Sequence, residues 1–205
     1  DQKESVDFLS GAMLIALCLI LFILITQFNS VSKTLIIISE VFFSVIGVLL
    51  GYVFFGQTIS IVMTGMGLVA LAGIVVRNGI LLVEFTDILK ERGMRTREAI
   101  VQAGKTRITP VLLTATATIL GLIPLAIGFN IDFYSLIAEG KPHIFFGGDN
   151  VAFFGALSWT IIYGLTFATF LTLIFIPVMY YLNYAGIIWI KRKINRIRIA
   201  FFLHD

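Results

Sequence analysis

Hydrophobic residues along this chain gather in five long stretches that are separated by shorter polar segments. The stretches cover residues 11–29, 34–55, 60–83, 108–129 and 151–183. A helix needs about 20 consecutive apolar residues to cross the hydrocarbon layer of a membrane. The last stretch is longer than one crossing requires, so we expect it to tilt or to extend beyond the bilayer. The pattern predicts an all-α membrane protein with five transmembrane helices.

The polar segments divide the chain into a lead-in at residues 1–10, a transmembrane domain at residues 11–183 and a basic tail at residues 184–205. The segment between the third and fourth stretches is long enough to hold a helix of its own. Thr96 as its cap, Glu98 in its first turn and Gly104 as its end predict a short amphipathic helix on the cytoplasmic surface. Pro110 then opens the fourth span, where proline is tolerated. A plain connector and a mechanical element are both compatible with this helix.

Composition and charge agree with a membrane protein and give it an orientation. The chain is 59% hydrophobic and 13% charged, and its mean hydropathy of +1.00 is far above that of soluble domains. Lysine and arginine concentrate after the first, third and fifth stretches. By the positive-inside rule these segments are cytoplasmic, which places the N-terminus outside and the C-terminus inside. The basic tail is therefore interpreted as a topological anchor and not as a nucleic-acid site.

Other classes of chemistry find little support in the sequence. Cys18 is the single cysteine, so no disulfide framework is expected. His143 has no second histidine or cysteine nearby, and we expect a solvated residue there and no metal site. Neither a phosphate-binding loop nor a nucleophile motif occurs, so we expect no cofactor and no enzyme. No signal precedes the first span and the chain opens on Asp1, which leads us to expect the end of a longer protein.

Arg77 is the strongest candidate functional residue, because it lies within the third hydrophobic stretch. A charge at that depth costs roughly 2.5 kcal/mol or more and normally faces a bundle interior or a partner charge. Asn78 is adjacent, and Glu84 lies seven residues on, nearly on the same helical face. Asp87 follows one turn later, where we expect it and Glu84 to pair with Lys90 or Arg92 at headgroup level. The alternative for Arg77 is an anchor that snorkels to the cytoplasmic headgroups.

Two further spans carry polar groups. In the fourth, Arg107, Thr114 and Thr118 share one helical face. Hydroxyl groups there either hold helices together or take part in a proton path, and both alternatives stay open. In the second span, Glu40 either faces a neighbouring helix or reaches the cytoplasmic headgroups near Lys33, and we favour the headgroups over a proton-carrying role.

These residues stand in motifs that resemble the resistance-nodulation-division (RND) permeases of bacterial multidrug efflux pumps. The motifs are Gly-x-Val-x-Leu-Ala-Gly-Ile-Val-Val-Arg-Asn-Gly-Ile-Leu-Leu-Val-Glu-Phe at 67–85, Arg-x-x-Pro-Val-Leu-Leu-Thr at 107–114 and Ile-Pro-Val-Met-Tyr at 176–180. They occur in the family's order, and the resemblance covers essentially the whole chain. It implies helices eight to twelve of a twelve-helix bundle, in a permease about five times longer than this chain.

The resemblance also implies roles for individual residues. In the family, protons pass through two aspartates on the fourth helix, a lysine on the tenth and a threonine on the eleventh. Arg77 matches that lysine, Thr114 the threonine and Arg107 a basic residue at the inner end of the path, while Asn78 follows the basic residue in the family too. Thr118 and Glu84 are secondary candidates. Arginine in place of lysine is a departure: it stays protonated, so we expect Arg77 to act as a counter-ion and not as a proton carrier.

We therefore expect the membrane part of a proton-driven drug exporter in a bacterial inner membrane. The implied partners are helices one to seven and the periplasmic domains of the permease, two further copies in a homotrimer, a periplasmic adaptor, an outer-membrane channel and the lipid bilayer. One alternative is a non-transporting structural or interaction subunit, which a short upstream reading frame would favour. A second is a sterol-handling or protein-export relative, against which the Arg77 and Thr114 pair speaks.

Overall fold

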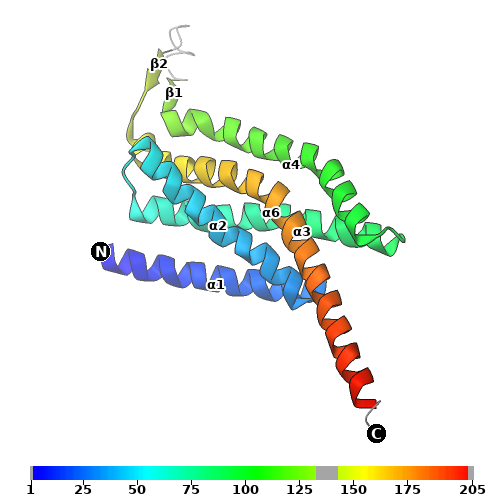
Figure 1. The fold of residues 1–205 in the computed structure, drawn as a ribbon. Coiled ribbons are helices and arrows are strands. Elements are labelled where there is room, and N and C mark those ends of the chain that lie inside the picture. The colour runs from blue at the N-terminus through cyan, green and yellow to red at the C-terminus, as the bar shows by residue number, and fades with distance from the viewer. Residues whose placement is uncertain (1, 133–142, 203–205) are drawn as a thin grey trace.

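The computed structural model describes residues 2–132 and 143–202, and five long helices account for most of them (Figure 1). They are α1 (Gln2–Phe28), α2 (Val31–Phe55), α3 (Ile61–Glu91), α4 (Thr96–Ile127) and α6 (Asp149–Phe202). Each contains a segment long and apolar enough to cross a membrane. The five predicted spans are therefore confirmed, although every helix except α2 extends well past the predicted hydrophobic stretch at one end or both.

Two of the helices end at glycine. Gly56 after α2 and Gly128 after α4 adopt the left-handed conformation with φ of 62° and 75°, and their N–H groups bond to the carbonyl oxygens of Tyr52 and Pro124. Glycine is the residue that takes this conformation without a steric penalty, which is why it closes helices so often. The chain reverses within a few residues after α2, so α2 and α3 lie antiparallel.

The interior of the bundle is built around α6, which contacts α2, α3 and α4. The α1 helix packs only against α2 and α3 among the described elements and leaves most of its surface open. Two clusters of buried side chains fill the contacts, one around Ile37 and Ile176 and the other around Leu71 and Leu165. Figure 1 shows the two chain ends at opposite ends of the bundle.

Glycines allow α2, α3 and α6 to approach closely. A Cβ atom added at Gly47 would lie 2.5 Å from Phe167, and one at Gly51 would lie 2.4 Å from Tyr163. On α6, a Cβ at Gly164 would lie 2.1 Å from the Leu71 side chain of α3. Helices in lipid associate through such close contacts at small residues, because water does not drive their association there. The three helices form a compact unit, called here the α2–α3–α6 interface.

The structure corrects the prediction for the segment after α3. Residues from Thr96 onward are helical as predicted, but the helix does not end at Gly104 and continues as α4 to Ile127. Pro110 lacks an N–H and so removes one backbone bond, to the Thr106 carbonyl, which bends a helix without having to stop it. Figure 1 shows α4 bending along its course. Continuing the helix satisfies the remaining backbone groups, and at a membrane that advantage is large.

Two smaller differences lie at the ends of α6. Before it, β1 (Phe129–Asp132) and β2 (His143–Phe146) pair as an antiparallel ribbon, with Phe129 opposite Phe146. The sequence analysis did not predict these strands. At the other end, α6 continues through most of the predicted basic tail to Phe202. The division of the chain into lead-in, transmembrane domain and tail stays a prediction.

Candidate functional site

Arg77 lies on an uncovered side of α3. The residues exposed along that side recur every three or four positions, which places them in one stripe; they are Met66, Ala70, Gly73, Arg77 and Leu81. Arg77 forms no hydrogen bond or ion pair with any residue in the described part of the chain. This stripe, called here the open face of α3, is apolar except for one guanidinium group.

The residues predicted to accompany Arg77 are placed differently. Asn78 turns into the bundle and is only 3% exposed. Glu84 is half-buried near the C-terminal end of α3 and forms no ion pair with Arg77. Arg77 therefore stands without a charge partner among residues 2–132 and 143–202 at the place where the sequence analysis expected a polar cluster.

On α4, Arg107 is the group that connects this site to α3. Its guanidinium carbon lies 4.6 Å from the centre of the Phe85 ring, which is a cation–π contact. Its Nε atom is buried and has no hydrogen-bond partner among the described residues. The contact joins the N-terminal half of α4 to the C-terminal half of α3.

The two α4 threonines bond to their own helix. The Thr114 hydroxyl lies 3.0 Å from the carbonyl oxygens of both Pro110 and Val111. The Thr118 hydroxyl donates to the Thr114 carbonyl oxygen at 2.8 Å. Thr114 is exposed and Thr118 half-buried, so neither hydroxyl links α4 to another helix within the described chain.

Arg77 and Thr114 lie at similar distances along their helices from the contact between Phe85 and Arg107. Arg77 is eight residues before Phe85 on α3, and Thr114 is seven residues after Arg107 on α4. At about 1.5 Å of rise per residue, each is roughly 10–12 Å from that contact along its own helix.

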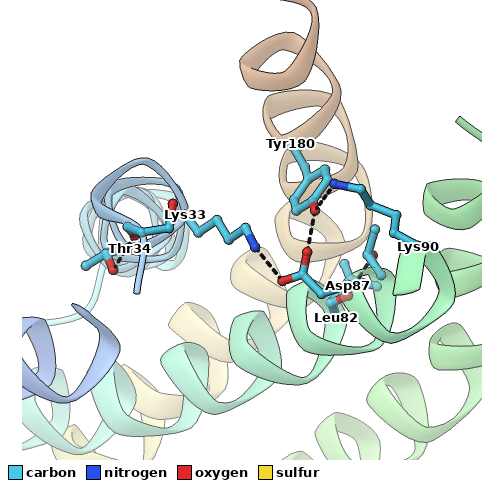
Figure 2. Close-up of polar contacts among 8 residues, drawn as sticks. Lys33, Thr34, Leu82, Asp87, Lys90 and Tyr180 are labelled. Carbon is cyan, nitrogen blue, oxygen red and sulfur yellow. Dashed lines mark hydrogen bonds and ion pairs between the residues drawn. The ribbon is translucent and has the colours of Figure 1, made fainter. Parts of the chain in front are cut away.

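Near the C-terminal end of α3, Asp87 joins three helices (Figure 2). Its carboxylate pairs with Lys33 of α2 at 2.7 Å and accepts a hydrogen bond from the Tyr180 hydroxyl of α6 at 2.6 Å. Lys90 donates to the same tyrosine oxygen at 3.2 Å. The predicted pairing of Asp87 with Lys90 or Arg92 is wrong, because Lys33 reaches the carboxylate across the α2–α3 contact and Tyr180 separates it from Lys90.

Glu40 is the buried group whose place the sequence analysis missed. It is 0% exposed and lies between α2, α3 and α6, where the Thr172 hydroxyl hydrogen-bonds to its Oε1. The headgroup position that we favoured is therefore wrong. The signal was present in the sequence, because Ser44 lies four residues after Glu40 on the same helical face, and both residues are buried. A face that carries small polar groups at this spacing is turned toward other helices and not toward lipid.

Comparison with known proteins agrees with this architecture. The model of the family described as AcrB/AcrD/AcrF matches residues 1–131. The chain belongs to this family. It is 37% identical over 180 residues to the swarming motility protein SwrC of Bacillus subtilis, covering 88% of this chain and 15% of SwrC. It is 31% identical over 169 residues to the multidrug resistance protein MdtC of Erwinia tasmaniensis, covering 82% of this chain and 15% of MdtC.

A solved structure is similar as well. The crystal structure of a heavy metal efflux pump superposes with a TM-score of 0.63 at 28% identity, over 81% of this chain and 15% of the pump. This protein is thus a multi-pass membrane protein of the RND permease family, and its relatives are transporters. The chain spans about 15% of the length of the curated relatives that it matches.

The Asp87 cluster yields a prediction about stability. Replacing Tyr180 by Phe removes the donor to Asp87 and the acceptor of Lys90 while the ring is kept. We expect a loss of about 1.5–3 kcal/mol in unfolding free energy, the usual range for a hydrogen bond to a charged group. The measurement is the unfolding midpoint of the detergent-solubilised permease. Tyr181→Phe is the matched control, because Tyr181 is 46% exposed. Equal midpoints for the two variants would contradict the assigned role of Tyr180.

Proposed function

We propose that this chain is the C-terminal membrane part of a proton-driven RND exporter and that Arg77 is the counter-ion of its proton relay. The observation that carries the proposal is the position of Arg77 on the open face of α3, without a charge partner among the described residues. An arginine at bilayer depth is too costly to be left facing lipid. A helix that carries carboxylate groups and docks on this face would complete the site.

The surroundings of Arg77 support such docking. Gly73 lies one turn before it, and a Cβ atom added there would meet nothing within 4 Å. An incoming helix can therefore approach the α3 backbone closely. Ala70 and Leu81 continue the apolar stripe on either side. The open face of α3 thus has space for another helix at Gly73 and carries a single charged group, the Arg77 guanidinium.

The proposed mechanism is electrostatic. Two carboxylate groups on the docked helix hold Arg77 while they are ionised. When they are protonated the attraction falls, and the guanidinium group turns to other polar partners such as Thr114. That rearrangement shifts α3, and the shift is transmitted to the rest of the permease. Arginine keeps its own proton throughout, so the transported protons reside on the carboxylates.

The proposed partners follow from the family. The remainder of the permease supplies the carboxylate helix and the periplasmic regions, two further copies complete a trimer, and an adaptor and an outer-membrane channel carry the substrate out of the cell. The printed names of relatives divide between multidrug resistance and heavy metal efflux. We propose drug/proton antiport, as the resemblance to multidrug efflux permeases implies, and we test both substrate classes.

The proposed orientation has a direct test. In a permease whose Cys18 is replaced by Ala, Thr58→Cys lies in the exposed turn between α2 and α3, and Met94→Cys lies in the turn between α3 and α4. With the N-terminus in the periplasm, a membrane-impermeant maleimide should label position 58 in cells with a permeabilised outer membrane and leave position 94 unlabelled. Position 94 should react only after the inner membrane is opened. Labelling of both positions in the first condition would refute the orientation.

The role of Arg77 is tested in the full-length permease. We expect Arg77→Ala to abolish export, because the carboxylates lose their counter-ion, and Arg77→Lys to retain part of it, because the charge survives without the forked geometry. Thr114→Ala should have a milder effect, on the order of 1 kcal/mol for one hydroxyl group. The measurement is the resistance to drugs and to divalent metal ions per unit of assembled permease.

Leu81→Ala is the matched control, because Leu81 lies on the open face of α3 one turn from Arg77 but carries no charge. It should retain export with some loss of assembly. The proposal fails if Arg77→Ala exports normally while Thr114→Ala does not. Arg77 would then be an anchor that snorkels to the headgroups. Resistance to metal ions without resistance to drugs would leave the proposed proton relay standing, but it would change the proposed substrate from drugs to metal ions.

A further inference from the structure

Glu40 is enclosed by three helices at a site that the proposed relay does not use. Its side chain is 0% exposed, and Oε1 is hydrogen-bonded to the Thr172 hydroxyl of α6. Oε2 is buried and has no hydrogen-bond partner among the described residues. It lies against Gly79 of α3, where an added Cβ atom would be 2.8 Å from it. The carboxyl group therefore fills a space that the missing side chain of Gly79 leaves open.

No cation in the described chain contacts Glu40. Tyr52 on α2 and Tyr163 on α6 are titratable groups buried in one end of the same interface. Toward its other end, the charged or titratable groups are Lys33 on α2, Asp87 on α3 and Tyr180 on α6, and these bond to one another. They lie seven or eight residues from Glu40, Gly79 and Thr172, which is roughly 10–12 Å along each helix. Arg77 is two residues from Gly79, which places it about 200° round the helix, on the opposite side of α3.

The hydrogen bonds around Thr172 distinguish the two protonation states of Glu40. The hydroxyl oxygen of Thr172 lies within hydrogen-bond distance of Glu40 Oε1 and, at 2.7 Å, of the Ala168 carbonyl oxygen. A hydroxyl group has one proton to donate but also accepts. If Glu40 is ionised, Thr172 must choose between two acceptors. If Glu40 is protonated at Oε1, it donates to Thr172, and Thr172 donates to Ala168, so the competition for the Thr172 proton ends and only the neutral Oε2 carbonyl oxygen stays without a partner.

We infer that Glu40 is a second proton-binding group of the membrane bundle, protonated while α2, α3 and α6 are packed against one another. An ionised carboxylate without a charge partner is too costly in so dry a place, whereas the neutral acid is accommodated by one hydrogen bond. Its link to transport rests on the proposed function; its protonation does not.

The proton balance at the site is simple. Protonation forms an O–H bond at Oε1 with a proton taken from water, and the Thr172 proton turns from Oε1 to the Ala168 carbonyl oxygen. Deprotonation returns that proton to water and reverses the turn. Because the carboxyl group is completely buried, water reaches it only when the interface opens. Binding and release of this proton are therefore coupled to the separation of α3 from α2 and α6.

The α3 helix connects this site to Arg77. One face of α3 carries the guanidinium group, and the opposite face presents Gly79 to Glu40. A displacement of α3 driven from the open face would move Gly79 away from Oε2 and let water in. Glu40 then exchanges its proton in the same step in which the relay changes state.

Infrared spectroscopy of the full-length permease tests the protonation. A protonated carboxylic acid has a C=O stretching band that ionised carboxylates and glutamine side chains lack. We expect this band near neutral pH in the wild type, its loss in Glu40→Gln, and a shift to higher frequency in Thr172→Val, where the hydrogen-bond partner is removed. Glu91→Gln, which changes an exposed glutamate at the end of α3, should leave the band intact.

Several outcomes would overturn the inference. The inference is wrong if the wild type lacks the carboxylic acid band, or if Glu40→Gln retains this band in full. If Glu40→Gln assembles poorly, Thr172→Val tests the same carboxyl group, because it removes the hydrogen-bond partner of Glu40. A C=O band that does not shift in Thr172→Val contradicts the assignment of the band to Glu40. Transport gives a second readout: Glu40→Gln should assemble normally but export with a shallower dependence on pH than the wild type. An unchanged pH profile would remove the link to transport. Normal export by Arg77→Ala would instead refute the relay and leave the infrared result standing.

Discussion

Close contact between helix backbones at glycine determines how the polar groups of this bundle are arranged. Gly47 and Gly51 of α2 receive the Phe167 and Tyr163 side chains of α6, and Gly164 of α6 receives Leu71 of α3. In lipid, such contacts replace the hydrophobic effect as the main source of helix association. They bring the three backbones close enough for Tyr52 of α2 to bond to the Thr160 hydroxyl and the Ala156 carbonyl oxygen of α6, both at 2.8 Å.

The same packing gives α3 two unlike sides. One side is pressed into the α2–α3–α6 interface and carries Gly79 against the Glu40 carboxyl group. The other side bears Arg77 and is uncovered by the described helices. A helix held firmly on one side and charged on the other is suited to transmit a change in electrostatic attraction as a displacement. The Phe85–Arg107 contact and the Asp87 cluster fix the C-terminal end of α3, so we propose that its movement is largest at Arg77 and Gly79.

The sequence predicted the number and order of the spans because each is a long apolar run, and length alone distinguishes such runs from soluble helices. It predicted the end of the amphipathic segment wrongly, because Gly104 and Pro110 are stop signals in water but only bend a helix at a membrane. It placed Glu40 at the headgroups because Lys33 is close in sequence. The contact with Thr172, 132 residues away, depends on how α2 and α6 cross, and no local pattern encodes that.

The Lys33–Asp87 pair was missed for a similar reason. Lys90 on the same helix is close to Asp87 in sequence, but the lysine that reaches the Asp87 carboxylate is Lys33, across the contact between α2 and α3. By contrast, the sequence alone identified Arg77 as a candidate functional residue, because it is a charged residue within a long apolar stretch. Its partner was not, because no carboxylate in the described chain reaches it. Residue types and spacing thus indicated where the chemistry lies, whereas helix crossing decided which groups meet.

A cryo-electron microscopy structure of the full-length permease in a lipid nanodisc tests the central claim most directly, namely that the open face of α3 is the docking surface of a carboxylate helix. The account predicts that a membrane helix from outside residues 1–205 covers Gly73 and Leu81, with at least one of its carboxylates in hydrogen-bond contact with the Arg77 guanidinium group. Lipid acyl chains along this face, with Arg77 extended toward the headgroups, would contradict it.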